Sequence, residues 1–450
     1  MQGKKPKPRQ KSRRYKTQMR KIRGEYMAYE NFNVEPGMSA WVDMPDEYKI
    51  AWKKWKAASQ GKKITEQNMV KMPEPQITPP APESVEKEAK KVKKKKLKKR
   101  GPLGGYDDKM TKTAAVCNYT DTRFFEERYK QITNGMIINK NRKRIMLVSD
   151  VCGWAWWNKS QYLKAYLADE FDINPIYIIG DGAARSIPKN KYDLYVTYGY
   201  SYVPYVAQTD RSKVVTGITA HRALHLLKPY MNMAGHVHAN SRMLEADLRK
   251  MVKHESVYYV PNGVDEELFY ERQPMRKEGT LIAGHVGKQC KEKGQLEIIL
   301  PAMAEADVES AYNMNDYRSR VPYCEMYKFY QGIDVFVVAS VEDGTPNGAL
   351  EAAACGRPIL SNRIGNMPEF IKDGYNGFLV DRKVGAYVER LKWMQKHREE
   401  TIEMGKNARK TVEERWTWSK QSDNWRKMFR NIFRLNVRRP NKRPKPTSQK

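Results

Sequence analysis

Two carboxylates and the loop between them are the residues of this sequence best suited to chemistry. Asp343 and Glu351 stand eight positions apart, on either side of a loop rich in Gly, Pro and Asn. Carboxylates accept charge-assisted hydrogen bonds from hydroxyl groups, and free backbone N–H groups at the start of a helix attract phosphate. Such a combination suits a ligand with both phosphates and hydroxyls, which describes a nucleotide sugar.

An apolar run precedes this loop and a helical run follows it. Val335–Ala339 has the composition of a buried strand, a helix is predicted to begin near Ala349, and Ile359–Leu360 begins a second short strand. Strand, loop, helix and strand form a βαβ unit, in which ligands bind beside the carboxyl end of the first strand. We therefore expect the two carboxylates at the ligand-binding edge of a parallel sheet.

A second set of apolar runs lies earlier in the chain. Strands are predicted at Arg144–Asp150 and Pro175–Ile179 with a helix through Tyr162–Leu167 between them, and further strands at Tyr192–Thr197 and Lys213–Thr219. This order predicts a Rossmann-like sheet of its own. The loop after its first strand has no GxGxxG pattern, which disfavours dinucleotide binding.

Several motifs resemble the retaining GT-B glycosyltransferases of the large family 4. The carboxylate-x7-Glu spacing is followed by AAACGRPILS and IGNMPE, and the PNGVD run at 261–265 resembles the crossover between the two domains of these enzymes. The resemblance covers roughly residues 144–434. It implies an α/β GT-B fold with two Rossmann-like domains facing a cleft. It also implies transfer of a hexose-type sugar with retention of configuration, without a metal or other cofactor.

The resemblance also gives roles to individual charged residues. Lys288 and Lys293 have the spacing of the Arg and Lys that clasp the donor diphosphate in the family. Asp343 stands where the family mostly has Glu near the donor sugar, and Glu351 matches the carboxylate that binds the ribose hydroxyls. His221, at the end of a predicted strand, matches a histidine that contacts the donor sugar, with a structural role as the alternative.

Glycines and one further carboxylate complete the predicted donor site. The loop from Gly344 to Gly348, which includes Asn347, is expected to offer backbone N–H groups to sugar and phosphate. Gly287 ends the strand that precedes the lysine pair. Glu369 either faces the cleft from a later turn or serves as an acid at a helix N-terminus.

The first loop of the N-terminal domain holds Gly153 and three tryptophans, Trp154, Trp156 and Trp157. In the family this loop faces the cleft, and Gly153 matches one of its usual paired glycines. The tryptophans are therefore candidates for stacking on an acceptor, and core packing is the alternative for each.

The predicted domain organisation follows the motifs and the composition. The chain begins with a basic, Pro/Lys-rich and mostly disordered extension at 1–102 and an uncertain connecting segment at 103–143. An acceptor-side Rossmann-like domain at 144–262 and a nucleotide-sugar-binding Rossmann-like domain at 263–415 follow. A C-terminal helix at 416–435 is predicted to pack back on the N-terminal domain, and a basic tail occupies 436–450.

Positive charge is concentrated at the two ends of the chain. The net charge is +31, yet residues 1–100 hold 28 Lys and Arg against 11 Asp and Glu, and residues 436–450 add six more basic residues and no acid. Such ends favour contact with polyanions, either nucleic acid or an anionic membrane surface, although a solvated tail without a partner is an equal alternative.

The remaining composition indicates a cellular location but does not identify the acceptor. Five scattered cysteines without a CxxC pair, and no run of eighteen apolar residues, predict a cytoplasmic protein that is soluble or peripheral. Two other functions stay open. The chain could be a nucleic-acid-binding protein with an inactive transferase domain, or a glycosyltransferase whose acceptor is a modified nucleic-acid base. The donor base and the acceptor cannot be read from the sequence.

Overall fold

The computed structural model describes residues 119–149, 153–177, 187, 190–206, 210–220, 224–252, 256–287, 291–314 and 321–437. The chain divides into two units, residues 1–103 and 104–450, and every described residue belongs to the second. The predicted extension at 1–102 and all but the first two residues of the predicted basic tail therefore lie outside the described residues.

The first half of the described chain forms a six-stranded parallel sheet in the order β2-β1-β3-β4-β5-β6. Its strands are β1 (Lys143–Ser149), β2 (Phe171–Tyr177), β3 (Leu194–Thr197), β4 (Val214–Ile218), β5 (His236–Ala239) and β6 (Val257–Tyr259). Its helices are α4 (Tyr119–Thr133), α5 (Ala155–Tyr166), α7 (Val203–Val206), α8 (Leu224–Met233) and α9 (Arg242–Met251).

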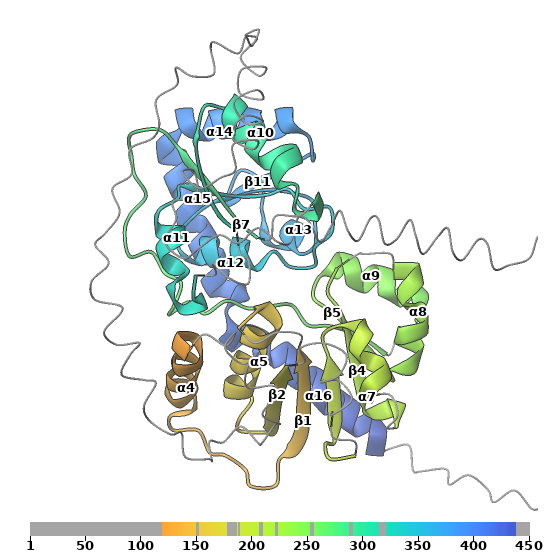
Figure 1. Cartoon of the computed structure of the whole chain (residues 1–450). Coiled ribbons are helices and arrows are strands. Elements are labelled where there is room, and N and C mark those ends of the chain that lie inside the picture. Colours follow the sequence, from red (N-terminus) through yellow and green to blue (C-terminus); the bar gives the residue numbers. More distant parts are fainter. Residues whose placement is uncertain are drawn as a thin grey trace, which may run out of the picture. The chain divides into compact units, whose positions relative to one another are not determined.

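The second half forms a five-stranded parallel sheet in the order β11-β10-β9-β7-β8. Its strands are β7 (Ile282–Gly287), β8 (Glu309–Met314), β9 (Val335–Val338), β10 (Ile359–Asn362) and β11 (Gly377–Val380). The helices of this half are α10 (Leu300–Glu305), α11 (Tyr327–Gln331), α12 (Asn347–Ala354), α13 (Met367–Phe370), α14 (Val384–Lys396), α15 (Arg398–Thr411) and α16 (Trp418–Val437). Two α/β domains with parallel sheets are thus present, as predicted (Figure 1).

Alternating apolar side chains explain why each sheet is covered on both faces. In β9, Phe336 and Val338 belong to the core with α11, α12 and α15, whereas Val335 and Val337 belong to the core with α10 and α14. Successive side chains of a strand point to opposite faces, and strands buried on both faces are uniformly apolar. This is the reason that Val335–Ala339 was recognisable from its composition.

The edge strands differ most from the sequence-based expectation, and β6 and β11, each at the edge of its sheet, were not predicted. β2 begins at Phe171, four residues before the predicted start at Pro175, and it occupies the edge of its sheet. A proline inside a strand is tolerated at an edge because its missing N–H is not needed by a neighbour. The strand β8 (Glu309–Met314) was not predicted; it is also an edge strand, and its polar sequence ESAYNM lacks the apolar run of a buried strand.

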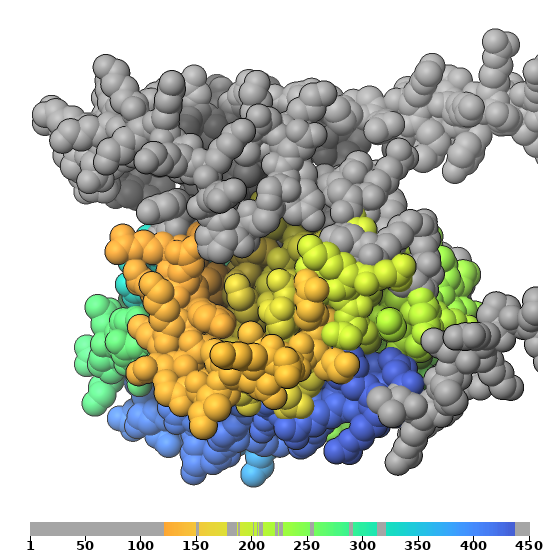
Figure 2. Space-filling model, turned by 90° about the horizontal axis from the view of Figure 1, so that it is seen from below, coloured from red at the N-terminus to blue at the C-terminus, as the bar shows by residue number. Residues whose placement is uncertain are grey.

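The last helix packs on the first sheet. Trp425 and Phe429 of α16 share a core with Ile145 and Leu147 of β1, and Arg426 donates hydrogen bonds to Asp169 at 3.0 Å. Figure 1 shows α16 beside the first sheet, and in Figure 2 it adjoins the segment that contains α4 and β1 on one face. Segments from the two ends of the described chain therefore lie side by side.

The helix α4 is joined to the crossover between the two sheets. Its Arg128 donates two hydrogen bonds of 2.9 Å to Asp265, which is fully buried. The Tyr162 hydroxyl of α5 donates to the same carboxylate at 2.9 Å. Next to it, the Val264 N–H donates to Trp416 and the Trp418 N–H donates to Val264, so that the two crossings of the chain run side by side.

No helix in the described part of the chain is both long and apolar enough to span a membrane.

Candidate active site

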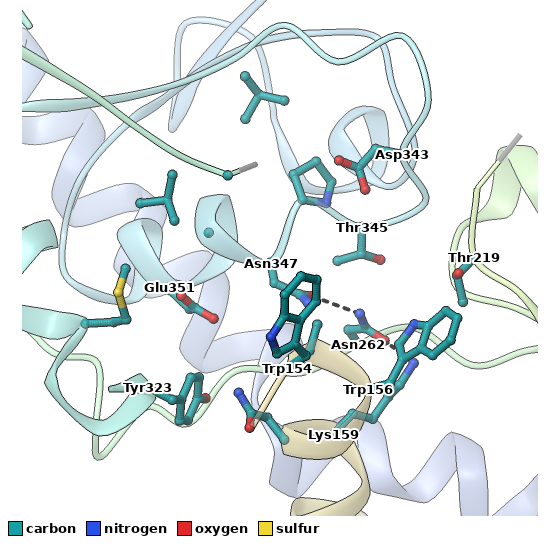
Figure 3. Close-up of a pocket in the computed structure, with 18 of the residues that line it drawn as sticks. Trp154, Trp156, Lys159, Thr219, Asn262, Tyr323, Asp343, Thr345, Asn347 and Glu351 are labelled. Carbon is teal, nitrogen blue, oxygen red and sulfur yellow. Dashed lines mark hydrogen bonds between the residues drawn. The ribbon is translucent and has the colours of Figure 1, made fainter. Parts of the chain in front are cut away.

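A pocket of about 380 Å³ is lined by residues that follow strands of both sheets. From the first sheet come the loop after β1 with the start of α5, the ends of β4 and β5, and Asn262 after β6. From the second come the end of β7, the loop after β9 and the start of α12. Carboxyl ends of parallel strands are where ligands bind in such folds, so this pocket is the candidate active site (Figure 3).

Two of the predicted donor residues form an ion pair in this pocket. The Nζ atom of Lys293 donates a hydrogen bond to Oδ2 of Asp343 at 2.5 Å, and the Ser340 hydroxyl lies 3.4 Å from the same oxygen. Both charged side chains remain partly accessible from the pocket, with 29% and 12% of their side-chain area exposed. A ligand can therefore reach the ammonium and the carboxylate together.

Glu351 lies deeper in the pocket wall, on the second turn of α12. Its Oε2 accepts a hydrogen bond of 2.6 Å from the hydroxyl of Tyr330. Burial raises the pKa of Glu351 to about 7, and the Tyr330 hydrogen bond opposes that rise. Its other carboxylate oxygen accepts a hydrogen bond from no described residue, so it is available to a ligand hydroxyl.

The start of α12 faces the same pocket without a capping side chain. Pro346 occupies the N-cap position and makes no side-chain hydrogen bond, and Asn347 and Gly348 line the pocket. The first N–H groups of a helix carry partial positive charge and attract anions. The start of α5 resembles it, because its N-cap residue Trp154 also provides no capping hydrogen bond.

Gly344 is required where the loop after β9 approaches the first sheet. A Cβ atom on this residue would lie 2.2 Å from both the Asn240 side chain and the Thr219 carbonyl oxygen. The next residue, Thr345, donates from its hydroxyl to the Asn240 carbonyl at 3.3 Å. The glycine therefore allows the loop after β9 to contact the loops after β4 and β5.

Asn262 of the PNGVD run connects the two sides of the pocket. Its Nδ2 donates to Oδ1 of Asn347 at 2.8 Å, and its Oδ1 accepts from Nζ of Lys159 at 3.1 Å. Lys159 is 3% exposed, and burial lowers its pKa to about 7. Its ammonium group lies 4.5 Å from the centroid of the Tyr198 ring, close enough for a cation–π contact.

His285, near the end of β7, contributes a neutral imidazole to the pocket. Its Nδ1 lies 2.8 Å from the Val337 carbonyl oxygen, to which it donates when the proton is on that nitrogen. Burial lowers the pKa of His285 to about 4, so the ring is uncharged at neutral pH. Among the described residues the Nε2 atom is buried without a hydrogen-bond partner, which leaves an acceptor beside Gly287, also a pocket residue.

The three tryptophans have different surroundings. Trp157 is 8% exposed and packs edge-on against Tyr177, with ring centroids 5.3 Å apart, so its role is core packing. Trp154 and Trp156 are partly exposed and line the pocket with Gly153, whose φ of +75° favours glycine. In Figure 3 both indoles are drawn in the same pocket as the loop after β9.

The remaining predicted residues are placed differently. Glu369 does not line the pocket: one oxygen accepts from the Arg242 N–H at 2.6 Å and the other from the Tyr259 hydroxyl at 2.5 Å. It thus supports the first turn of α9 from the other domain. His221 and Lys288 lie outside the described residues. Among the residues that the structure describes, no three His, Cys, Asp or Glu side chains cluster as metal ligands would.

The pocket residues that the sequence reasoning missed include four that the structure shows in polar contacts or in the pocket wall: Lys159, Asn262, His285 and Tyr330. His285 could have been found, because a histidine near the end of a predicted strand is the same signal that singled out His221. Asn262 belongs to a Pro-Asn-Gly sequence, which by itself indicates only a turn. Lys159 and Tyr330 carry no local signal, because their positions depend on how helices pack in three dimensions.

Comparison with known proteins agrees with this architecture. The structure resembles sucrose-phosphate synthase from Thermosynechococcus elongatus, with a TM-score of 0.54 and 17% identity over 65% of this chain and 100% of that one. It also resembles Anabaena HepE in complex with UDP and glucose, with a TM-score of 0.52 and 15% identity over 64% of this chain and 100% of that one. The predicted GT-B fold is confirmed.

At the level of sequence, residues 313–411 match the family described as Glycosyl transferases group 1. Over 213 residues the chain is 23% identical to an uncharacterized glycosyltransferase of Methanocaldococcus jannaschii, which covers 43% of this chain. The chain spans 58% of the length of that relative. The predicted resemblance to glycosyltransferases is confirmed, and the matched segment includes Asp343, Asn347 and Glu351.

Proposed function

We propose that this protein is a glycosyltransferase that moves a sugar from a nucleotide-sugar donor to an acceptor with retention of configuration. The observation that carries the proposal is the arrangement in one pocket of the uncapped start of α12, the Lys293 ammonium and the Glu351 carboxylate. The helix start matches the charge of a diphosphate, the Lys293 ammonium matches its leaving oxygen, and the Glu351 carboxylate matches a ribose diol.

The phosphate end of the donor fits the N-terminus of α12 and Lys293. Negative charge builds up on the diphosphate as the sugar leaves, and positive groups fixed in place before the reaction stabilise that charge. Lys293 is held by Asp343 at 2.5 Å, so the diphosphate shares the ammonium with this carboxylate. Asp343 in turn offers an acceptor to the hydroxyls of the transferred sugar.

The ribose fits Glu351. A carboxylate accepts two charge-assisted hydrogen bonds from a diol, and Tyr330 fixes one oxygen of Glu351 from behind. The solved complex of Anabaena HepE with UDP-glucose makes UDP-sugars the first donors to try, with other bases as alternatives.

The proposed reaction is the one that the family resemblance implies. The bond between the anomeric carbon and the phosphate oxygen breaks, and the nucleoside diphosphate leaves with the electron pair. The acceptor hydroxyl forms the new bond on the same face of the sugar, and its proton passes to the departing phosphate oxygen. This route requires neither a protein nucleophile nor a metal ion, and we propose that the enzyme uses none.

The acceptor side is the wall formed by Gly153, Trp154 and Trp156. Their partly exposed indoles offer flat apolar surfaces beside the loop after β9, which suits the ring face of a sugar or a base. A cytoplasmic setting, and contact of the basic ends with nucleic acid or an anionic membrane, remain proposals. The rival of an inactive, nucleic-acid-binding chain depends on those ends, and no described residue favours it.

The test is hydrolysis and transfer with a panel of nucleotide sugars. The wild-type protein should release nucleoside diphosphate from at least one donor. Lys293→Met should reduce turnover at least about a hundredfold, as expected when a group that stabilises developing charge is removed. Glu351→Gln should also reduce turnover, because the ribose loses its charged acceptor. Lys291→Met is the matched control for Lys293→Met, because Lys291 lies in the same short helix but is exposed and directed to Glu297.

The donor panel should be repeated with added nucleic acid, lipid vesicles or protein, and with a chain that lacks residues 1–102. Wild-type turnover in Glu351→Gln or Lys293→Met, or no release from any donor, would refute the assignment.

A further inference from the structure

A chain of three side chains crosses from helix α5 to helix α12 along the pocket. Lys159 of α5 donates to Oδ1 of Asn262 at 3.1 Å, and Nδ2 of Asn262 donates to Oδ1 of Asn347 at 2.8 Å. Figure 3 shows these residues together, with dashed lines for the hydrogen bonds between them. Asn347 is the first residue of α12, so the chain ends at the uncapped helix start.

The direction of this hydrogen-bond relay is fixed by its first member. A lysine ammonium has three donors and no acceptor, so Asn262 must turn its carbonyl oxygen toward Lys159 and its amide nitrogen toward Asn347. Asn347 must then turn its own carbonyl oxygen toward Asn262. Its remaining group, Nδ2, donates to no described residue and lies in the pocket wall.

The charge at the origin of the relay is buried without a counter-charge. Lys159 is 3% exposed, and among the described residues no carboxylate contacts it. Its surroundings are the aromatic rings of Tyr198 and Trp425 and the imidazole of His238, whose pKa is lowered by burial and by Lys159. A lone buried ammonium is costly, and an anion bound nearby would offset that cost.

We propose that Lys159 is a positioning residue that acts through Asn262 to hold the Asn347 amide as a hydrogen-bond donor toward an oxygen of the nucleotide-sugar donor. This inference rests on the proposed function, because it names the donor as the ligand. The relay makes the pocket select an oxygen that accepts a hydrogen bond at this point, and reject a group that can only donate.

The first experiment measures binding of UDP, and of the other nucleoside diphosphates of the panel, by calorimetry. Lys159→Met should weaken binding about tenfold, the value of one charge-supported hydrogen bond. In a Glu351→Gln background, which removes the carboxyl that also titrates near pH 7, binding should weaken as pH rises from 7 to 9. Lys164→Met is the matched control, because Lys164 lies on the same helix with its ammonium over the Tyr129 ring.

Epistasis separates positioning from a general structural role. In an Asn347→Leu background the relay has lost its last member, so Lys159→Met should cause no further loss of UDP affinity. With Glu351→Gln also present, the fall in affinity between pH 7 and pH 9 should vanish. Equal losses from Lys159→Met with and without Asn347 would overturn the proposal.

A second experiment needs no ligand. Lys159→Met and Asn347→Leu, alone and together, are compared by their denaturant midpoints, first with Asn262 present and then with Asn262→Leu. If the relay exists, the shifts in midpoint caused by Lys159→Met and Asn347→Leu should not add up in the double variant when Asn262 is present, and they should add up once Asn262 is replaced. Additive midpoints in both backgrounds would overturn the relay itself. Absence of all nucleotide binding by the wild type would instead refute the proposed function, and with it the role toward the donor.

Discussion

The ammonium of Lys293 and the carboxylate of Asp343 lie 2.5 Å apart, although they follow different strands of the second sheet, β7 and β9. The pair places a positive and a negative charge at the same point of the pocket wall. A diphosphate that binds Lys293 must therefore tolerate the nearby carboxylate, and a sugar hydroxyl that binds Asp343 does so beside the lysine.

Replacement of Asp343 by Asn should separate binding from turnover. Removal of the negative charge should strengthen binding of free nucleoside diphosphate by about fivefold, since two like charges about 4 Å apart repel each other by roughly 1 kcal/mol in bulk water. Turnover should fall at least about tenfold, because the sugar loses its charged acceptor. Calorimetry and donor hydrolysis measure the two effects. Ser340→Ala, which removes a neighbour of the same oxygen, is the control, and weaker diphosphate binding in Asp343→Asn would contradict the arrangement.

Ionisation of Glu351 should control donor affinity near neutral pH. Burial raises the pKa of this carboxyl to about 7, and only the charged form accepts two hydrogen bonds from the ribose. Nucleotide affinity should therefore rise between pH 6 and pH 8 in a Lys159→Met background, in which the other buried pocket group with a pKa near 7 is absent, and it should stay flat over this range when Glu351→Gln is added. Tyr330→Phe removes a hydrogen bond that stabilises the charged form of Glu351. The rise in nucleotide affinity should therefore occur at a pH higher by roughly one unit.

The contribution of Glu351 to the free energy of unfolding should fall as pH rises, whereas its contribution to nucleotide affinity should increase. An acid whose pKa is raised in the folded state binds its proton more tightly there than in the unfolded chain. Its contribution is fully present below pH 4.5 and is lost as pH rises through about 7. Glu351→Gln should therefore gain stability relative to the wild type between pH 5 and pH 8, by up to about 3 kcal/mol. A constant difference across that range would show that Glu351 is not buried as described.

Lys159 should make the wild type more stable at higher pH. Burial lowers its pKa from 10.5 to about 7, so between these values the folded chain binds fewer protons than the unfolded chain and stability rises with pH. Relative to Lys159→Met, the free energy of unfolding should increase by up to about 5 kcal/mol between pH 7 and pH 10.5. Denaturant unfolding at pH 7 and pH 9.5 measures this change. Lys164→Met, the control, should show only part of this pH-dependent change in stability. If the difference in the free energy of unfolding between the wild type and Lys159→Met did not depend on pH, the buried position of Lys159 would be contradicted.

Glu369 should prove to be a structural residue. Both of its oxygens accept hydrogen bonds, from the Arg242 N–H and the Tyr259 hydroxyl, and a glutamine at this position would present an amide nitrogen to one of these donors. Glu369→Gln should lower the free energy of unfolding by about 1–2 kcal/mol, with nucleotide affinity within about twofold of wild type. Tyr259→Phe, which removes one partner, is the comparison. Loss of nucleotide affinity without loss of stability would instead support the donor-binding role predicted from the sequence.

The sequence predicted an element correctly where its local residue pattern matches its position in the folded protein. Runs such as Val335–Ala339 predicted central strands because those strands are apolar on both faces. Edge strands gave a weaker signal: β8 is polar, and β2 contains Pro175. Asp343, Lys293 and Glu351 were predicted together from the family resemblance, and the structure places all three in one pocket.

The rest of the site depends on contacts between elements far apart in the chain. Nothing near Lys159 in the sequence distinguishes it from a surface lysine, and its role becomes visible through Asn262, more than a hundred positions away. Glu369 has the local features of both predicted roles, and its contact with α9 favours the structural one. His221 and Lys288 lie outside the described residues, and their roles stay predictions.

The position of α16 has a consequence for the order in which the protein can fold during synthesis. Ile145 and Leu147 emerge from the ribosome early, but the side chains that cover them, Trp425 and Phe429, are among the last of the described residues to be made. Domains usually fold as they emerge. Here α4 and α5 can cover part of this apolar face early, but the first domain cannot complete its core until the second domain has been translated.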